Sequence, residues 1–377
     1  MSLLVPWQVR QAVRDFLEWP ERRKLAPLRR KIRRHGGGVP VVGFGSVLDD
    51  GRAVHGGAVK LLHLRDALPS GEEAFDVLYA VSSSLPLAAF DLFRICTDRG
   101  IKIVWNQNGV AYPGWAGRES ERFNAPMRRL RDAADFVVYQ SEFCKISASN
   151  FLGPCDMRSE ILYNPVDASV FAPGPKREAA SVRLLAAGTH GTRDRVTCVL
   201  DALAELRAGG IEAELTVAGQ FQWPRGEEDF VAQVSRLGLE KFVRRIERFS
   251  QADAPALYRG HHILLHPKYM DPCPTVVLEA MASGLPVVGS RSGGMPEIVP
   301  PDCGVLVDAP QGWDTRHTPS GSELATAVAG LLPNLPAAAA AARRNAEERF
   351  DVGKWIEAHG RIFQGVSLTS EKSAPNL

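Results

Sequence analysis

Apolar and polar positions along the chain predict strands and helices in regular alternation. Short apolar runs, such as 75–82 and 101–105, are separated by longer stretches of mixed polarity, such as 86–96 and 122–134. Runs that are apolar at nearly every position are typical of parallel strands buried on both faces, whereas half-solvated strands alternate. The region 39–163 therefore predicts a parallel sheet covered by helices on both sides.

The same alternation restarts after a proline-containing boundary near 164–175. Further strands are expected at 182–187, 213–218, 243–247, 262–266, 286–288 and 305–307. A chain of 377 residues also exceeds the size that one hydrophobic core usually fills. We therefore predict an α/β protein with two Rossmann-like, doubly wound domains facing a cleft, where ligands bind beyond the carboxyl ends of the strands. The predicted segments are a basic helical extension (1–38), a first domain (39–167), a second domain (168–352) and a helix with a tail that crosses back (353–377).

Composition and cysteine usage narrow the class of protein. The chain is 45% hydrophobic and 23% charged, as in ordinary globular proteins. Its six cysteines include no CxxC pair, which argues against a zinc site and a disulfide framework and fits a reducing compartment. Neither a signal peptide nor a membrane span is predicted. A cytoplasmic location is expected, with a peripheral position at the inner membrane face left open.

Positive charge is concentrated at the start of the chain. Residues 1–35 hold ten lysines and arginines against three acidic residues, although the whole chain carries only +2. Tryptophans and valines lie among these arginines, a pattern typical of an interfacial amphipathic helix. Contact of residues 5–34 with an anionic membrane surface and packing of this helix on the first domain both stay open. Nucleic acid is not an expected partner, since no recognisable module accompanies the charge.

The segment 268–288 contains the most informative chemistry. Asp271 lies in a loop stiffened by prolines, and Glu279 lies one turn inside the helix that follows and that ends at Gly284. Free N–H groups at a helix start favour phosphate, and carboxylates accept hydrogen bonds from vicinal hydroxyls. A nucleotide sugar offers both kinds of group, because its hexose and ribose flank a diphosphate.

This segment resembles the E-x7-E donor motif of family 4 retaining glycosyltransferases of the GT-B fold. The resemblance includes the run Glu-Ala-Met-Ala-Ser-Gly-Leu-Pro-Val-Val from Glu279 and continues through 292–299. It implies that Glu279 binds the ribose and Asp271 the transferred sugar, and that the backbone of Pro274, Thr275 and Val276 approaches sugar and phosphate. The chain departs from the motif at Asp271, where the family has a glutamate one methylene longer.

The loop 188–195 follows the first strand of the second domain. The resemblance implies an arginine and a lysine here that neutralise the donor diphosphate, but Thr189 occupies the arginine position. Arg193 is the predicted substitute for the lysine, and it joins Asp271 and Glu279 as a predicted catalytic residue. Gly188, Arg195 and Lys268 are predicted donor-binding residues, the last two as alternative second cations.

Two features of the first domain are also candidates. Gly56 and Gly57 resemble the glycine-rich turn of the family, which lets the backbone approach the donor. Asn106, Gln107 and Asn108 follow a predicted strand where many relatives have a histidine, and they are predicted acceptor-side residues. An equally open interpretation is that these amides cap the end of the strand.

The sequence predicts a metal-independent, retaining transferase without a cofactor. No Asp-x-Asp is present, so arginines and helix N-termini would stabilise the leaving group. The expected reaction moves a sugar from a nucleotide-sugar to a glycan or lipid-linked acceptor, in surface polysaccharide or glycolipid synthesis. A sugar-nucleotide epimerase and a non-catalytic sugar-binding or scaffold relative are the alternatives. The nucleotide base, sugar, acceptor, linkage and oligomeric state are not specified by any motif.

Overall fold

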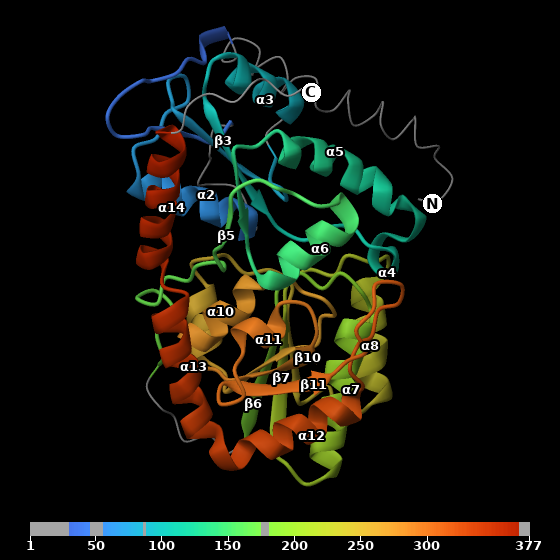
Figure 1. The fold of residues 1–377 in the computed structure, drawn as a ribbon. Helices are drawn as coiled ribbons and strands as arrows, with labels where there is room; N and C mark the ends of the chain where they lie inside the picture. The colour runs from blue at the N-terminus through green and yellow to red at the C-terminus, as the bar shows by residue number, and fades with distance from the viewer. Residues whose placement is uncertain (1–29, 46–55, 86–87, 175–180, 369–377) are drawn as a thin grey trace.

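The computed structural model describes residues 30–45, 56–85, 88–174 and 181–368, which form two parallel sheets (Figure 1). Residues 1–29 of the predicted basic extension lie outside the described residues. At its described end, Ile32 is buried against the first domain and the backbone of Arg33 bridges to Ala74.

The first domain is built on a five-stranded sheet in the order β1-β2-β3-β4-β5. Strands β2, β3 and β4 are buried at every position, and β2 and β4 are apolar throughout, so helices cover both faces. Helices α3, α5 and α6 pack on one face, around Phe93 and Leu130, and α2 packs on the other, around Leu64. The elements are β1 (Val42–Gly43), α2 (Gly56–Ala67), β2 (Val77–Val81), α3 (Ala89–Asp98), β3 (Lys102–Gln107), α4 (Pro113–Ala116), η1 (Gly117–Glu119), α5 (Ser120–Asp132), β4 (Phe136–Tyr139), α6 (Glu142–Leu152) and β5 (Ser159–Ile161).

The second domain is built on a six-stranded parallel sheet in the order β11-β10-β9-β6-β7-β8. Helices α7 and α12 pack together on one face, and α10 and α13 on the other. The elements are β6 (Val182–Ala187), α7 (Asp194–Ala208), β7 (Ala213–Ala218), α8 (Gly226–Arg236), β8 (Val243–Ile246), α9 (Ala254–Arg259), β9 (Ile263–His266), α10 (Thr275–Ala282), β10 (Val287–Arg291), α11 (Met295–Ile298), β11 (Gly304–Asp308), α12 (Gly321–Leu331), η2 (Leu332–Asn334) and α13 (Leu335–Arg349).

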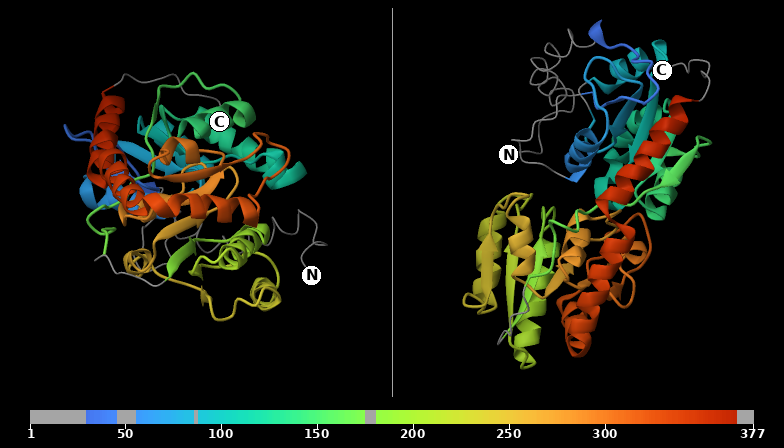
Figure 2. Two further views of the ribbon diagram at one scale, coloured as in Figure 1. Left: turned by 90° about the horizontal axis from the view of Figure 1, so that it is seen from below. Right: turned by 90° about the vertical axis from the view of Figure 1, so that its left-hand side faces the viewer.

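The chain crosses between the domains twice, and the two crossings are hydrogen-bonded to each other. The backbone of Val166 pairs with Phe350 and Val352 at 2.8 and 3.1 Å. After the second crossing, α14 (Val352–Ser367) runs back along the first domain (Figure 2). Its residues Trp355 and Phe363 are buried there, so the last helix of the chain completes the first core.

The helical run Gly321–Arg349 is long and apolar enough, by length and composition, to cross a membrane. It is interrupted by η2, and its two parts pack on α7 and α10. Leu324 and Val328 are fully buried in the core of the second domain. Packing within the protein therefore accounts for part of this apolar run, since 39% of its most apolar window is buried.

Candidate functional site

The order of strands in the second sheet reverses between β6 and β9, which are neighbours in the sheet although the strands β7 and β8 lie between them in the sequence. Ligands of open α/β sheets bind beyond the carboxyl ends of strands at such a reversal. Gly188 directly follows β6, and His266 is the last residue of β9. The loop that carries Asp271 continues from β9, so Gly188 and Asp271 both lie at this point of the sheet.

The Asp271 loop is fixed by the turn that follows β10. The Ser292 hydroxyl accepts a hydrogen bond from the Met270 N–H at 2.9 Å, and the Gly294 N–H donates to the Asp271 carbonyl at 2.9 Å. A side chain at Gly294 would place its Cβ 1.9 Å from the Pro272 carbonyl oxygen. The glycine is therefore required because two backbones touch at the base of the loop.

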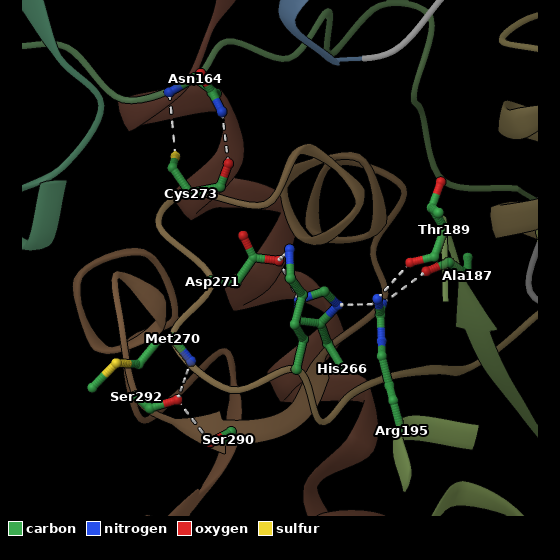
Figure 3. A network of polar contacts seen from close by, with 11 residues as sticks. Asn164, Ala187, Thr189, Arg195, His266, Met270, Asp271, Cys273, Ser290 and Ser292 are labelled. Carbon is green, nitrogen blue, oxygen red and sulfur yellow. Dashed lines mark hydrogen bonds and ion pairs between the residues drawn. The ribbon is translucent and has the colours of Figure 1, made fainter. Parts of the chain in front are cut away.

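The Asp271 carboxylate is buried between two nitrogen groups (Figure 3). His266 Nε2 lies 3.1 Å from Oδ2, and the half-exposed Lys268 Nζ lies 3.0 Å from the same oxygen. Burial alone would raise the pKa of Asp271, but the Lys268 ammonium and the bond to His266 outweigh it and hold this pKa well below its ordinary value. Asp271 is therefore a carboxylate that accepts hydrogen bonds.

His266 connects Asp271 to Arg195. Burial lowers the pKa of His266 to about 4, so the ring is neutral near pH 7. Since a carboxylate only accepts, Nε2 donates to Asp271, and Nδ1 is left to accept from Arg195 Nη2 at 3.4 Å. The guanidinium also donates to the carbonyls of Thr189 and Ala187, at 2.8 and 3.4 Å (Figure 3). Arg195 is buried and held in place without a carboxylate partner among the described residues.

Glu279 lies on α10, whose first turn begins at Thr275 after Pro274, a residue that supplies no side-chain cap. The Glu279 carboxylate accepts from the Tyr258 hydroxyl at 2.8 Å and from Gln251 Nε2 at 3.1 Å. Burial raises its pKa, against the effect of these two hydrogen bonds. The start of α10 thus combines uncapped backbone donors with a carboxylate whose orientation is fixed.

The structure separates the two arginines of the 188–195 loop. Arg193 directly precedes α7 without a side-chain cap to it and is more than half exposed, and it pairs with Asp229 at 3.8 Å. Arg195 points instead toward His266 and the Asp271 loop. Gly188 has φ of +98°, and a Cβ there would lie 3.2 Å from Val276 Cγ1, so this backbone is close to the start of α10. Gly188, Val276 and Arg195 lie together, whereas Arg193 lies apart from them.

In the first domain, the structure corrects the expected position of the amides. Asn106 and Gln107 are the last residues of β3 and do not follow the strand. Gln107 accepts a hydrogen bond from Trp105 Nε1 at 2.8 Å and contacts Met127 of α5, so its side chain packs in the core of the first domain. Asn106 and Asn108 point to the other face, because side chains alternate along a strand. Gly56 and Gly57 are the first two residues of α2.

Side chains from both domains meet at the Asp271 loop. Asn164 Nδ2 donates to the Cys273 carbonyl at 2.6 Å and to Gln140 Oε1 at 3.3 Å. A Cβ at Gly109 would lie 3.2 Å from Pro272 Cγ. The amide-bearing ends of β3 and β4 therefore lie against the loop that carries Asp271.

Three polar residues of this region were missed by sequence reasoning. His266 ends a buried strand five residues before Asp271, and this position was a readable signal for a residue at the site. Ser292 lies in the segment 292–299 already singled out. Lys60 of α2, whose Nζ donates to Asn106 Oδ1 at 2.9 Å, gave no signal in the sequence, because one lysine on a helix is ordinarily solvated. Among the described residues, no group of three or more histidines, cysteines and acidic residues has the arrangement of a metal site.

Part of this chain matches a known family, and its fold matches solved structures. Residues 181–333, which include Asp271 and Glu279, match the family described as "Glycosyl transferases group 1". Across 89% of this chain and 100% of the other, the structure superposes on Anabaena Alr3699/HepE in complex with UDP, with a TM-score of 0.68 and 17% identity. A glycosyltransferase from Rickettsia africae gives a TM-score of 0.62 at 13% identity over 78% of each chain. The fold is GT-B.

Curated relatives are similar over part of the chain. An MMP alpha-(1->4)-mannosyltransferase of Mycolicibacterium hassiacum is 29% identical over 45% of this chain and 38% of its own length. A GDP-mannose-dependent alpha-(1-6)-phosphatidylinositol monomannoside mannosyltransferase of Mycolicibacterium smegmatis is 28% identical over 64% of each. This GT-B chain thus spans less than two thirds of the length of the curated relatives it matches first.

Proposed function

We propose that this GT-B protein is a glycosyltransferase that moves a sugar from a nucleotide-sugar donor to a glycan or lipid-linked acceptor. The observation that carries the proposal is the placement of Asp271 and Glu279 at the two sides of the α10 N-terminus, beyond the strand reversal. Both carboxylates lie within the segment that matches the glycosyltransferase family. The mannosyltransferase names of two relatives support a glycolipid or surface polysaccharide as the product.

The donor would bind along α10. Asp271 is ionised and would accept hydrogen bonds from hydroxyls of the transferred sugar, and Glu279 would accept from the ribose. The first-turn amides at Thr275 and Val276 would face the diphosphate, at the positive end of the helix. Lys268 is half exposed, so its ammonium would leave Asp271 and contact a phosphate oxygen when a sugar hydroxyl takes its place.

Charge that develops on the leaving diphosphate would be stabilised by Lys268, Arg195 and the start of α10. In a retaining reaction, the bond from the anomeric carbon to the phosphate oxygen breaks while the acceptor oxygen bonds to the same face. The departing phosphate accepts the proton of the acceptor hydroxyl, so no protein nucleophile is required. We propose that this chemistry uses no metal and no cofactor besides the donor. A peripheral position at the inner membrane face, with residues 5–34 on the lipid, would bring the enzyme to a lipid-linked acceptor.

A hydrolysis screen with UDP-, GDP-, ADP- and dTDP-sugars, with and without EDTA, tests the proposed function. We expect one nucleotide class to be hydrolysed at a rate that EDTA leaves unchanged. Asp271→Asn should lower this rate at least roughly tenfold, since hydrogen bonds to a charged acceptor contribute about 1.5–3 kcal/mol. Asp302→Asn, at an exposed position of the same domain, is the matched control and should retain the wild-type rate. A protein that hydrolyses none of these donors would contradict the proposal.

A further inference from the structure

Lys60 is an ammonium group buried in the first domain with only neutral partners. Its side chain extends from α2, and the residue is 2% exposed. Nζ donates to Asn106 Oδ1 at 2.9 Å and to Asn108 Oδ1 at 3.3 Å. No carboxylate of the described residues lies within 4 Å of Nζ. A charge buried without a counter-ion is costly, so a fold that keeps one at the edge of its candidate site requires an explanation.

The ammonium determines how the two amides are oriented. It can only donate, so both Oδ1 atoms must face it and both NH2 groups must point away. Gln140 Nε2 approaches the same two oxygens, which reinforces this orientation. Asn108 is partly exposed, and its NH2 group is directed to the exposed Ser83 hydroxyl. Lys60 therefore makes Asn108 present a hydrogen-bond donor, and it polarises the amide that does so.

This oriented amide group is connected to the donor side. Gln140 Oε1 accepts from Asn164, and Asn164 donates to the Cys273 carbonyl in the loop that holds Asp271. The Cys273 thiol is within electrostatic range of both Lys60 and Asp271. The amides at the end of β3 and the Asp271 carboxylate thus belong to one boundary between the domains.

We propose that Lys60 is a positioning residue whose protonated form, with the buried Asn106 amide beside it, orients the Asn108 amide to bind an oxygen of the transferred sugar. The inference rests on the proposed function, since it assigns the Asn108 amide to the sugar of the donor. Asp271 would accept hydrogen bonds from the sugar on one side, and the Asn108 NH2 group would donate to it on the other. When Lys60 loses its proton, the amides are free to rotate and this donor is no longer fixed.

The proton on Lys60 is lost in an accessible pH range. Burial lowers the pKa of Lys60 to about 8. The ionisable groups that face it are Cys144 of α6, Cys273 of the donor loop and His359 of α14. Burial raises the pKa of Cys144 to about 12 and that of Cys273 still higher, and it lowers that of His359 to about 3. Near pH 8, Lys60 is therefore the group of this set that titrates.

The test is the pH dependence of two constants between pH 6.5 and 9.5. The first is KM for hydrolysis of whichever UDP-, GDP-, ADP- or dTDP-sugar is hydrolysed fastest, and the second is the inhibition constant of the matching nucleoside diphosphate. We expect KM of the wild type to rise about tenfold above pH 8, while the nucleoside diphosphate, which lacks the sugar, binds equally well throughout. Lys60→Arg should move the rise in KM at least one pH unit upward, because arginine stays protonated.

Three further variants keep the outcome interpretable. Lys60→Met should show a KM raised about tenfold at every pH, and Lys145→Met, at an exposed lysine of α6, should behave as the wild type. Asn108→Asp removes the NH2 group that would donate to the sugar, so its KM should be raised at every pH without a further rise near pH 8, independently of how Lys60→Arg packs. A KM that is flat with pH in the wild type, or an unchanged rise in both Lys60→Arg and Asn108→Asp, would overturn the inference and leave the proposed function intact. Absence of hydrolysis with every donor would overturn both.

Discussion

His266 makes the electrostatics of the candidate site dependent on pH. Its pKa is lowered by burial from an ordinary 6.5 to about 4, while its Nε2 donates to Asp271. Between these two values the unfolded chain binds a proton at this position that the folded chain does not bind. The free energy of unfolding must therefore fall as the pH falls from 6.5 toward 4.

We expect His266→Asn to reduce this loss of stability. One pKa unit corresponds to about 1.4 kcal/mol, so His266 alone accounts for a loss on the order of 3 kcal/mol across the window. Urea denaturation at pH 7 and pH 4.5 measures the difference for wild type and variant. Replacement of the exposed His35 by asparagine is the control. An equal loss in the wild type and in His266→Asn would contradict the assignment.

At the residue scale, a site residue could be proposed from the sequence only where it lies within a local motif. Asp271 and Glu279 could be proposed as site residues because spacing, prolines and a helix lie in one continuous segment. The role of Lys60 depends on which strands and loops become neighbours, and spacing along the chain carries no such information. Gln107 was grouped with the amides on either side of it, although side chains two apart on a strand share a face. Alternation alone would have paired it with Trp105, as the structure does.

At the scale of elements, the loop that holds Asp271 depends on a glycine. A Cβ at Gly294 would lie 1.9 Å from the Pro272 carbonyl oxygen. Because this oxygen belongs to the backbone, the clash could be relieved only by moving the loop itself. We expect Gly294→Ala to displace the loop and to lower donor hydrolysis more than tenfold. The measurement is the hydrolysis rate alongside the melting temperature.

Gly330→Ala, on helix α12, is the control for Gly294→Ala. No atom lies within 4 Å of the added Cβ, and alanine in a helix interior is favoured over glycine by about 0.5–1 kcal/mol. This variant should keep its activity and melt at the same or a higher temperature. If both variants hydrolysed the donor at the wild-type rate, the contact between the turn and the loop would not matter for function.

The longer elements were predictable because their apolar runs are continuous. Strands at 182–187 and 213–218 agree with β6 and β7 residue for residue. The short helices α4 and α11 were not expected, since each is fixed by distant contacts. Glu297 of α11, for example, accepts from the backbone of Glu142 and Phe143 at the start of α6. Helix α12 was also missed, although its capping box from Ser320 to Glu323 is a local signal.

At the scale of the whole molecule, the two domains are joined by specific contacts as well as by the two chain crossings. Glu297 caps α6 from the opposite domain, and Trp313 packs on Phe143 and Phe151. The Gly114 N–H donates to the Trp313 carbonyl at 2.6 Å. The two-domain architecture was predictable from the repeated alternation of strands and helices. The contacts that join the domains were not predictable, because they link residues more than 150 positions apart and no local sequence pattern indicates them.

The central claim is that the α10 region binds a nucleotide-sugar through Glu279. Its most direct test is calorimetric titration of the donor class found in the hydrolysis screen into wild type and Glu279→Gln. Glutamine retains an acceptor for the Tyr258 hydroxyl, so the fold is preserved while the charge is removed. The account predicts a Kd at least roughly tenfold weaker for Glu279→Gln, and an unchanged Kd for Glu240→Gln at an exposed position. Equal affinity of wild type and Glu279→Gln would contradict it.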